Sequence, residues 1–154
     1  YVLNLTDLTH ENVEALQFDT SHDPVRPELD LDFRLGPGRR VYVLETDGKY
    51  QAAICVAYTN EVPTTVKELD LMSQAACQED QHGSICVAYT VWSRAPRAGR
   101  DVVFRLLDEC RANDKVKRLI TLSPKTDMAR RFHLNNGAVT LQNNTATDNY
   151  EYSL

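Results

Sequence analysis

Two copies of one six-residue run limit the folds open to this chain of 154 residues. Residues 54–59 and residues 85–90 both read Ile-Cys-Val-Ala-Tyr-Thr. Six residues are too few for a repeat architecture, so we interpret the copies as two similar central strands. Both runs are largely apolar, as is typical of strands that are covered on both faces. The sequence therefore predicts an α/β (α+β) domain in which helices flank a sheet.

The second copy leads into a loop that is rich in arginine and glycine. The β-type run 85–92 is followed by the loop 94–100, after which apolar residues such as Val102 and Leu106 recur at helical spacing. The first-turn amides of a helix lack internal partners and the helix dipole adds positive charge, so a helix start binds anions. Arginine side chains in such a loop suit a pyrophosphate. The candidate binding residues are Val91, Trp92, Arg94, Arg97, Ala98, Gly99, Arg100 and Asp101, together with Thr126 at the start of a later helix.

Basic residues are concentrated around this loop. Residues 94–131 contain eleven Lys and Arg and five Asp and Glu, whereas the rest of the chain contains six and seventeen, which together give the net charge of −5. An acidic protein with one basic segment argues against general nucleic-acid binding and favours a local polyanion site. The alternative is that these arginines decorate a solvated helix face. The adjoining loop with Gly99 favours the anion site.

The remaining composition is that of one globular domain, which we expect to span residues 1–154. The sequence contains neither a transmembrane run nor a signal peptide, so no membrane association is expected. The four cysteines show no Cys-x-x-Cys spacing, and two of them lie in apolar strands. We therefore expect reduced thiols in a cytoplasmic protein, without a disulfide framework or a metal site.

Turn and capping signals predict the other elements. Asp7 or Thr9 is expected to cap a first helix that runs through Leu16. The irregular stretch 22–38 is interpreted as a lid or substrate-covering segment, in which a short helix is allowed. Asp47-Gly48 indicates a hairpin. Further predicted elements are a helix from 64 or 65 to about 76, a strand over 117–123, a helix over 126–135 stopped by Gly137, and a final hairpin over 139–142 and 150–153.

The loop 94–100, the helix that follows it, and residues 129–133 with Gly137 resemble the acyl-CoA-binding core of the GNAT superfamily of N-acetyltransferases. The resemblance implies a mixed, mostly antiparallel sheet that splays between two strands, with helices on both faces. It also implies a coenzyme A thioester as substrate, whose pyrophosphate the loop amides hold. In this chain, Arg97 occupies the place of the loop's middle glycine, and His133 occupies the place of a tyrosine that often protonates the leaving thiolate.

Four segments resemble a narrower family, the catalytic domain of malonyl-CoA decarboxylase. They are residues 57–63, 122–124, 132–138 and 149–152, and the Phe-His-x-x-Asn-Gly-Ala match is the most specific of them. The resemblance implies that His133 and a hydroxyl near the end of the acyl-binding strand form the catalytic pair. A tyrosine of the terminal strand assists them.

The candidate catalytic residues are therefore His133, Thr90, Ser93 and Tyr150. Thr90 and Ser93 are alternatives for the hydroxyl. The other histidines, His10, His22 and His82, lie in cap or turn contexts, and we expect no chemical role for them.

Three functions remain open from the residues. Decarboxylation of a β-carboxyacyl thioester, such as malonyl-CoA, leaves an enolate, which Thr90 or strand-end amides could stabilise and which His133 could protonate if it titrates near neutrality. Transfer of acetyl from acetyl-CoA to an amine needs a base and an acid, and His133 or Tyr150 could supply the acid. The third function is a coenzyme A-binding module without catalysis. The expected partner is a small-molecule acyl-CoA, and a homodimer remains an option.

Overall fold

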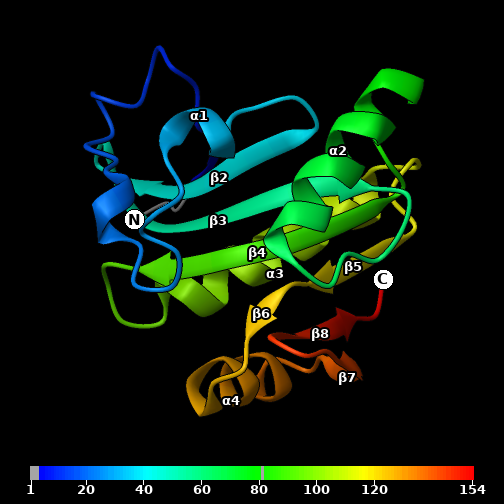
Figure 1. Ribbon diagram of the computed structural model, residues 1–154. Coiled ribbons are helices and arrows are strands. Elements are labelled where there is room, and N and C mark those ends of the chain that lie inside the picture. The colour runs from blue at the N-terminus through cyan, green and yellow to red at the C-terminus, as the bar shows by residue number, and fades with distance from the viewer. Residues whose placement is uncertain (1–3, 81) are drawn as a thin grey trace.

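The computed structural model describes residues 4–80 and 82–154, and these form one mixed sheet with helices packed on it (Figure 1). The strand order is β1-β2-β3-β4-β5-β8-β6, and β7 pairs with β8. Neighbouring strands are antiparallel except β4 and β5, which are parallel, so the expected mostly antiparallel mixed sheet is confirmed. The strands are β1 (Asn4–Asp7), β2 (Arg39–Thr46), β3 (Lys49–Thr59), β4 (Ile85–Ser93), β5 (Arg118–Thr121), β6 (Ser123–Pro124), β7 (Val139–Asn143) and β8 (Thr147–Tyr152).

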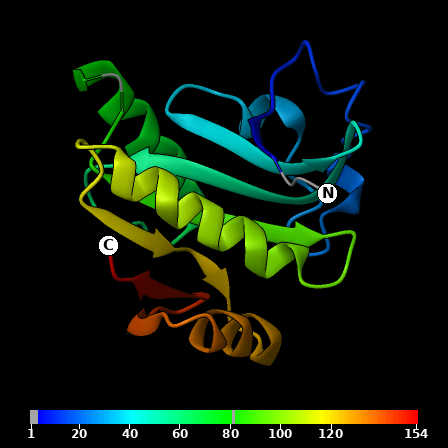
Figure 2. The same cartoon turned by 180° about the vertical axis from the view of Figure 1, so that it is seen from behind.

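Helices cover both faces of the sheet, as predicted (Figures 1 and 2). On one face lies α3 (Ala98–Ala112), and on the other lie α1 (Leu31–Arg34) and α2 (Val66–Asp80). A 3₁₀ turn, η1 (Thr20–His22), precedes α1, and α4 (Asp127–Asn135) lies beside the β7–β8 hairpin. Within the described ranges, no helix is both long and apolar enough to cross a membrane.

The two layers explain why the repeated run is apolar throughout. Ile54 and Cys86 face α3 and join its Val102 in one core cluster, whereas Cys55 and Val87 face the other layer and join Leu69 of α2 in a second cluster. The two copies form the adjacent strands β3 and β4. The interpretation of the copies as neighbouring central strands is therefore confirmed.

The sheet splays where β4 leaves β5. The register between β3 and β4 shifts so that Cys55 faces Thr90 and Val56 faces Ala88, which makes Tyr89 the extra residue of a β-bulge. Parallel pairing with β5 ends at Ala88 opposite Thr121. One more bond follows, from the amide of Leu122 to the carbonyl of Ala88. Beyond it, the two strands separate.

Most of the elements predicted from turns and caps are present, but the first helix is not. Thr46 pairs with Lys49 across the predicted hairpin turn.

In place of the predicted first helix, residues 10–17 form successive turns, and Gln17 has a φ of 58°. Thr9 and Asn12 exchange amide-to-side-chain bonds that begin a helical turn, but the chain then reverses to bury Leu16. The strand β1 was not anticipated.

Two glycines with the same backbone conformation provide a matched test of the packing between α2 and the sheet. Gly38 and Gly48 both have a φ of 78°. A Cβ at Gly38 would lie 2.4 Å from the carbonyl oxygen of Ser73 in α2, whereas a Cβ at Gly48 would have no atom within 4 Å. Gly48→Ala should cost only the left-handed strain of about 1 kcal/mol. Gly38→Ala adds the steric overlap and should cost about 2–4 kcal/mol in total. Urea unfolding should measure both, and equal losses would contradict the close approach of α2.

Candidate functional site

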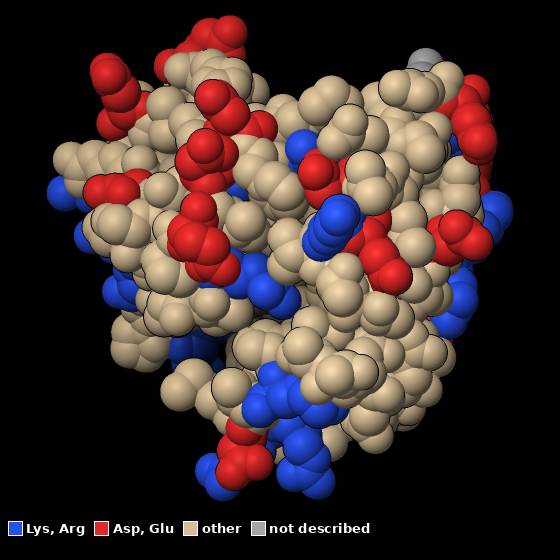
Figure 3. Space-filling view, in the orientation of Figure 1, with Lys and Arg blue, Asp and Glu red and all other residues tan. Residues whose placement is uncertain are grey.

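A cavity of about 320 Å³ opens where β4 and β5 separate. The segment before α1, the end of β4, the start of α3, β6 and α4 all contribute to its wall. The lining residues are His22, Pro24, Val25, Ala88, Tyr89, Thr90, Val91, Trp92, Ser93, Gly99, Ser123, Pro124, Thr126, Met128, Ala129, Phe132 and His133. On the face that carries α2, the surface is hollowed beside α4, with Lys and Arg atoms in and below the hollow (Figure 3).

The cavity passes from one face of the sheet to the other. Val91 and Phe132 in its wall pack on the core cluster that includes α3. Tyr89 and Trp92 in its wall belong to the cluster of the opposite face. The strand separation therefore connects the α3 side of the sheet with the side that residues 22–25 cover. His22, Pro24 and Val25, at the start of the stretch interpreted as a lid, line the cavity.

The predicted anion loop leads into α3, and its free amides are fewer than expected. Arg97 precedes the helix in the left-handed region, with a φ of 68° and no side-chain cap. The amide of Ala98 bonds to Ala95, and the amide of Asp101 bonds to Arg97. Across residues 4–80 and 82–154, no hydrogen bond is formed by the amides of Gly99 and Arg100. These two amides are thus the ones left free at the predicted anion site.

The three arginines of the loop are exposed but point in different directions. The guanidinium of Arg94 lies 5.1 Å from the ring centre of Tyr50, and that of Arg100 lies 5.0 Å from the ring centre of Phe104. Within the described ranges, no carboxylate forms an ion pair with Arg94, Arg97 or Arg100. The loop therefore carries unneutralised positive charge, although the side chains of Arg94 and Arg100 lie on different aromatic rings.

His133 lies in the wall of the cavity with only 6% of its surface exposed. Its Nδ1 is 2.7 Å from the Tyr152 hydroxyl. Burial lowers the pKa of His133 to about 4. The imidazole is therefore neutral at neutral pH, which corrects the expectation that it titrates there.

The tyrosine that is hydrogen-bonded to His133 is Tyr152. Tyr150, the candidate from the sequence, stacks on the imidazole with ring centres 5.5 Å apart, and neither tyrosine is among the residues that line the cavity. Burial raises the pKa of Tyr152 to about 12, so this hydroxyl keeps its proton. Both tyrosines lie on the same face of β8, and the period of a strand does not distinguish between them.

The candidate hydroxyls differ in what they can offer a ligand. The Oγ1 of Thr90 is 2.9 Å from both carboxylate oxygens of Asp23, so its hydrogen is donated to Asp23. Ser93 is exposed in the cavity wall. Ser123, which we did not single out as a candidate hydroxyl, also lines the cavity and donates to Thr121 at 2.8 Å. Ser93 is thus the candidate with a hydrogen left for a ligand.

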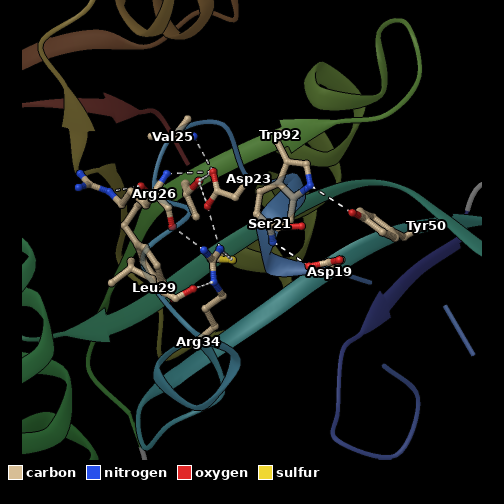
Figure 4. A network of polar contacts seen from close by, with 12 residues as sticks. Asp19, Ser21, Asp23, Val25, Arg26, Leu29, Arg34, Tyr50 and Trp92 are labelled. Atoms are coloured by element: carbon tan, nitrogen blue, oxygen red, sulfur yellow. Dashed lines mark hydrogen bonds and ion pairs between the residues drawn. The ribbon is translucent and has the colours of Figure 1, made fainter. Parts of the chain in front are cut away.

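Asp23 and Arg34 form a buried ion pair beneath the cavity (Figure 4). Neither side chain is exposed, and their closest atoms are 2.9 Å apart. Asp23 also accepts from the amides of Val25 and Arg26, while Arg34 donates to the carbonyls of Arg26 and Leu29. The pair therefore fixes the covering segment against β4.

Arg26 bridges the gap between the separated strands. Its Nε donates to the carbonyl of Tyr89 at 3.0 Å, and its Nη2 donates to the carbonyl of Leu122 at 3.3 Å. Strand separation would otherwise leave both carbonyls without a ladder partner. Sequence patterns gave no signal for this contact because it joins positions that are far apart in the chain.

All four cysteines are free thiols, and Cys55, Cys86 and Cys110 are buried. In the part of the chain that the structure describes, no three His, Cys, Asp or Glu side chains are grouped as metal ligands.

Comparison with known proteins supports the fold. No protein-family model and no curated protein sequence matches the chain. Malonyl-CoA decarboxylase from Agrobacterium vitis matches 99% of this chain with a TM-score of 0.70 and 14% identity. The GNAT-like decarboxylase GphF, solved with isobutyryl-CoA, matches 97% of it with a TM-score of 0.71 and 13% identity. An acetyltransferase from Thermus thermophilus matches 100% of it with a TM-score of 0.64 and 13% identity.

These likenesses show that the chain has the GNAT fold. The matched region is 60% of the malonyl-CoA decarboxylase chain but 98% of the GphF chain and 98% of the acetyltransferase chain. The resemblance to GNAT domains, decarboxylases among them, is thus confirmed at the level of structure.

Because of the buried ion pair, we expect Asp23 to contribute much more to the free energy of unfolding than the nearby Asp19. Asp23→Asn leaves the Arg34 charge buried without a counterion, which should cost about 3–5 kcal/mol of unfolding free energy. Asp19, which caps the η1 turn through the amide of Ser21 and is exposed, is the matched control. Chemical denaturation of Asp23→Asn and Asp19→Asn should show a much smaller loss for Asp19→Asn. Similar losses in both variants would contradict the anchoring role of Asp23.

Proposed function

We propose that the chain is an acyl-CoA enzyme that decarboxylates a β-carboxyacyl-CoA, such as malonyl-CoA, to an acyl-CoA and CO₂. The observation that carries this proposal is that His133, in the wall of a cavity at the splay of the GNAT sheet, is hydrogen-bonded to the buried Tyr152 behind it. Two of the solved structures with this fold are decarboxylases by description, and one of them holds isobutyryl-CoA.

The free amides at the start of α3 support a placement for coenzyme A. A pyrophosphate at Gly99 and Arg100 would use both amides and the positive end of the helix. Gly99, Thr126 and Ala129 line the adjoining part of the cavity, through which a pantetheine arm would pass. The thioester would then lie between β4 and β6, next to His133.

After CO₂ is lost, the site must transfer a proton to the α-carbon. The electron pair of the broken C–C bond forms an enolate, and the α-carbon must then receive a proton. Neutral His133 can release its Nε2 proton only if Nδ1 receives another in the same step. The Tyr152 hydroxyl at 2.7 Å is placed to supply it, and solvent then reprotonates the tyrosinate.

The pKa values favour this use of the pair over acetyl transfer. A thioester α-carbon is far less acidic than a tyrosine whose pKa is about 12, so proton transfer to the enolate is downhill. A thiol is much more acidic, with a pKa of about 8.5 for a cysteine side chain, so proton transfer from Tyr152 to a leaving thiolate has a smaller driving force. The pair is therefore better matched to a carbanion than to a thiolate.

Acetyl transfer to an amine is the second candidate. It is favoured by the match to a Thermus thermophilus acetyltransferase over nearly the whole of both chains.

Mass spectrometry of two incubations separates the candidates. One contains malonyl-CoA alone, and the other contains acetyl-CoA plus a mixture of amines. Acetyl-CoA formed from malonyl-CoA supports decarboxylation. Acetylated amine without decarboxylation contradicts it, and binding without any product indicates a coenzyme A-binding module.

His133→Ala should lower turnover of malonyl-CoA by about two to four decades, the range for loss of a general acid. Tyr152→Phe removes only the proton that Nδ1 receives and should lower turnover about ten- to hundredfold. Affinity for coenzyme A should stay nearly unchanged in both variants, because the loss is confined to the transition state. His10→Ala, which changes an exposed histidine outside this cavity, is the control. Wild-type turnover in His133→Ala would refute the assignment.

Arg97→Gly tests the anion loop without disturbing its backbone, because glycine adopts a φ of 68° without strain. Affinity for coenzyme A should fall about two- to fivefold at low salt, as expected for an exposed charge pair, and the difference should shrink at high salt. Arg111→Ala, near the opposite end of α3, should have no effect. Isothermal titration calorimetry measures both. Unchanged affinity in Arg97→Gly and in Arg100→Ala would exclude these side chains from the site.

A further inference from the structure

The cavity contains a second imidazole, on the opposite side of the sheet from His133. His22 ends the η1 turn in the covering segment and lines the cavity. Its ring meets the hydroxyl end of Tyr50, which belongs with Trp92 to the core cluster of the α2 face. His133 instead packs on Tyr150 and Tyr152, which belong to the α3-side cluster. A thioester between the separated strands would therefore have one imidazole on each side.

Hydrogen bonds behind His22 determine which of its nitrogens carries hydrogen. The indole of Trp92 can only donate, and its Nε1 lies 3.4 Å from the Tyr50 hydroxyl (Figure 4). Tyr50 thus accepts from Trp92, and we assign its own hydrogen to the Nδ1 of His22 at 2.5 Å. Because Nδ1 accepts, the neutral ring carries its hydrogen on Nε2. His22 is set up as a hydrogen-bond donor and not as a base.

The rest of the cavity wall offers few exposed donors on the covered side. Neither Lys nor Arg is among the lining residues. The hydrogens of the Thr90 and Ser123 hydroxyls are committed to Asp23 and Thr121.

Two other lining hydroxyls keep a hydrogen. Ser93 lies on the α3 side, beside Gly99, and the Tyr89 hydroxyl is buried without a partner among the described residues. His22 is therefore the exposed side-chain donor for a negatively charged group that reaches the covered side of the sheet.

We propose that the Nε2–H of His22 binds the distal carboxylate of the acyl group, so that the site selects acyl-CoAs that carry a carboxylate beyond the thioester. This assignment deepens the proposed function and rests on it for the identity of the ligand. Negative charge leaves the carboxylate as CO₂ forms and moves to the enolate beside His133. The contact with His22 therefore contributes to binding of the ground state and not to the rate of the chemical step.

Two thioethers of coenzyme A test the assignment without turnover. The 2-carboxyethyl thioether places a carboxylate at the same number of bonds from sulfur as malonyl-CoA but cannot lose CO₂, and the propyl thioether lacks the charge. Calorimetry with wild type, His22→Phe and His22→Gln compares both ligands. Phenylalanine keeps an aromatic ring beside Tyr50 but removes the N–H, whereas glutamine keeps a donor. His10→Phe is the matched control.

His22→Phe should weaken the carboxyethyl thioether about tenfold, as expected for loss of a hydrogen bond to a charged group, and should change the propyl thioether less than about twofold. His22→Gln should retain part of the preference. An unchanged preference in His22→Phe, or equal weakening of both ligands, would overturn the assignment. A carboxylate preference that depends on His22, without any malonyl-CoA turnover, would refute decarboxylation alone. Turnover without that preference would refute the role of His22 alone.

Discussion

The separation of β4 from β5 after Ala88 is the constraint on which the other features of this molecule depend. An opened ladder leaves backbone carbonyls that must find donors away from water. Arg26 supplies both donors, and its position follows from the buried pair of Asp23 and Arg34. A buried ion pair contributes little net stability by itself. Here it fixes the segment that closes one side of the cavity.

The same separation gives the two sides of the cavity different electrostatics. On the α3 side, exposed arginines and the free amides of Gly99 and Arg100 favour an anion near solvent. Deeper in, burial keeps His133 neutral and Tyr152 protonated. Neither Asp nor Glu is among the lining residues. The nearby Asp23 is saturated by Arg34, Thr90 and two amides. The interior of the cavity thus carries little fixed charge, and a charged ligand would dominate its electrostatics.

Local patterns predicted the elements whose determinants lie within a few residues of one another. The Asp47-Gly48 turn, the stop at Gly137 and the two copies of the strand were all readable because turn geometry and burial act locally. The first helix was predicted wrongly. Its capping residues are present, but the chain that follows them forms turns that bury Leu16 against the sheet. The choice between Tyr150 and Tyr152 depends on a ring orientation across α4 and β8, and no sequence pattern encodes it.

The histidines show why site prediction needs the tertiary structure. His133 stood out because it lies within a specific motif, whereas His22 lies in a turn that had no motif. Its environment comes from Tyr50 on β3 and Trp92 on β4, which lie at the same end of this antiparallel strand pair. An indole can donate but not accept, which fixes the Trp92–Tyr50 bond, and the assigned Tyr50 hydrogen continues the chain of hydrogen bonds to His22. His22, which had no sequence signal, thereby acquires a defined donor. The splayed sheet places it on the opposite side of the cavity from His133, which the motif identified.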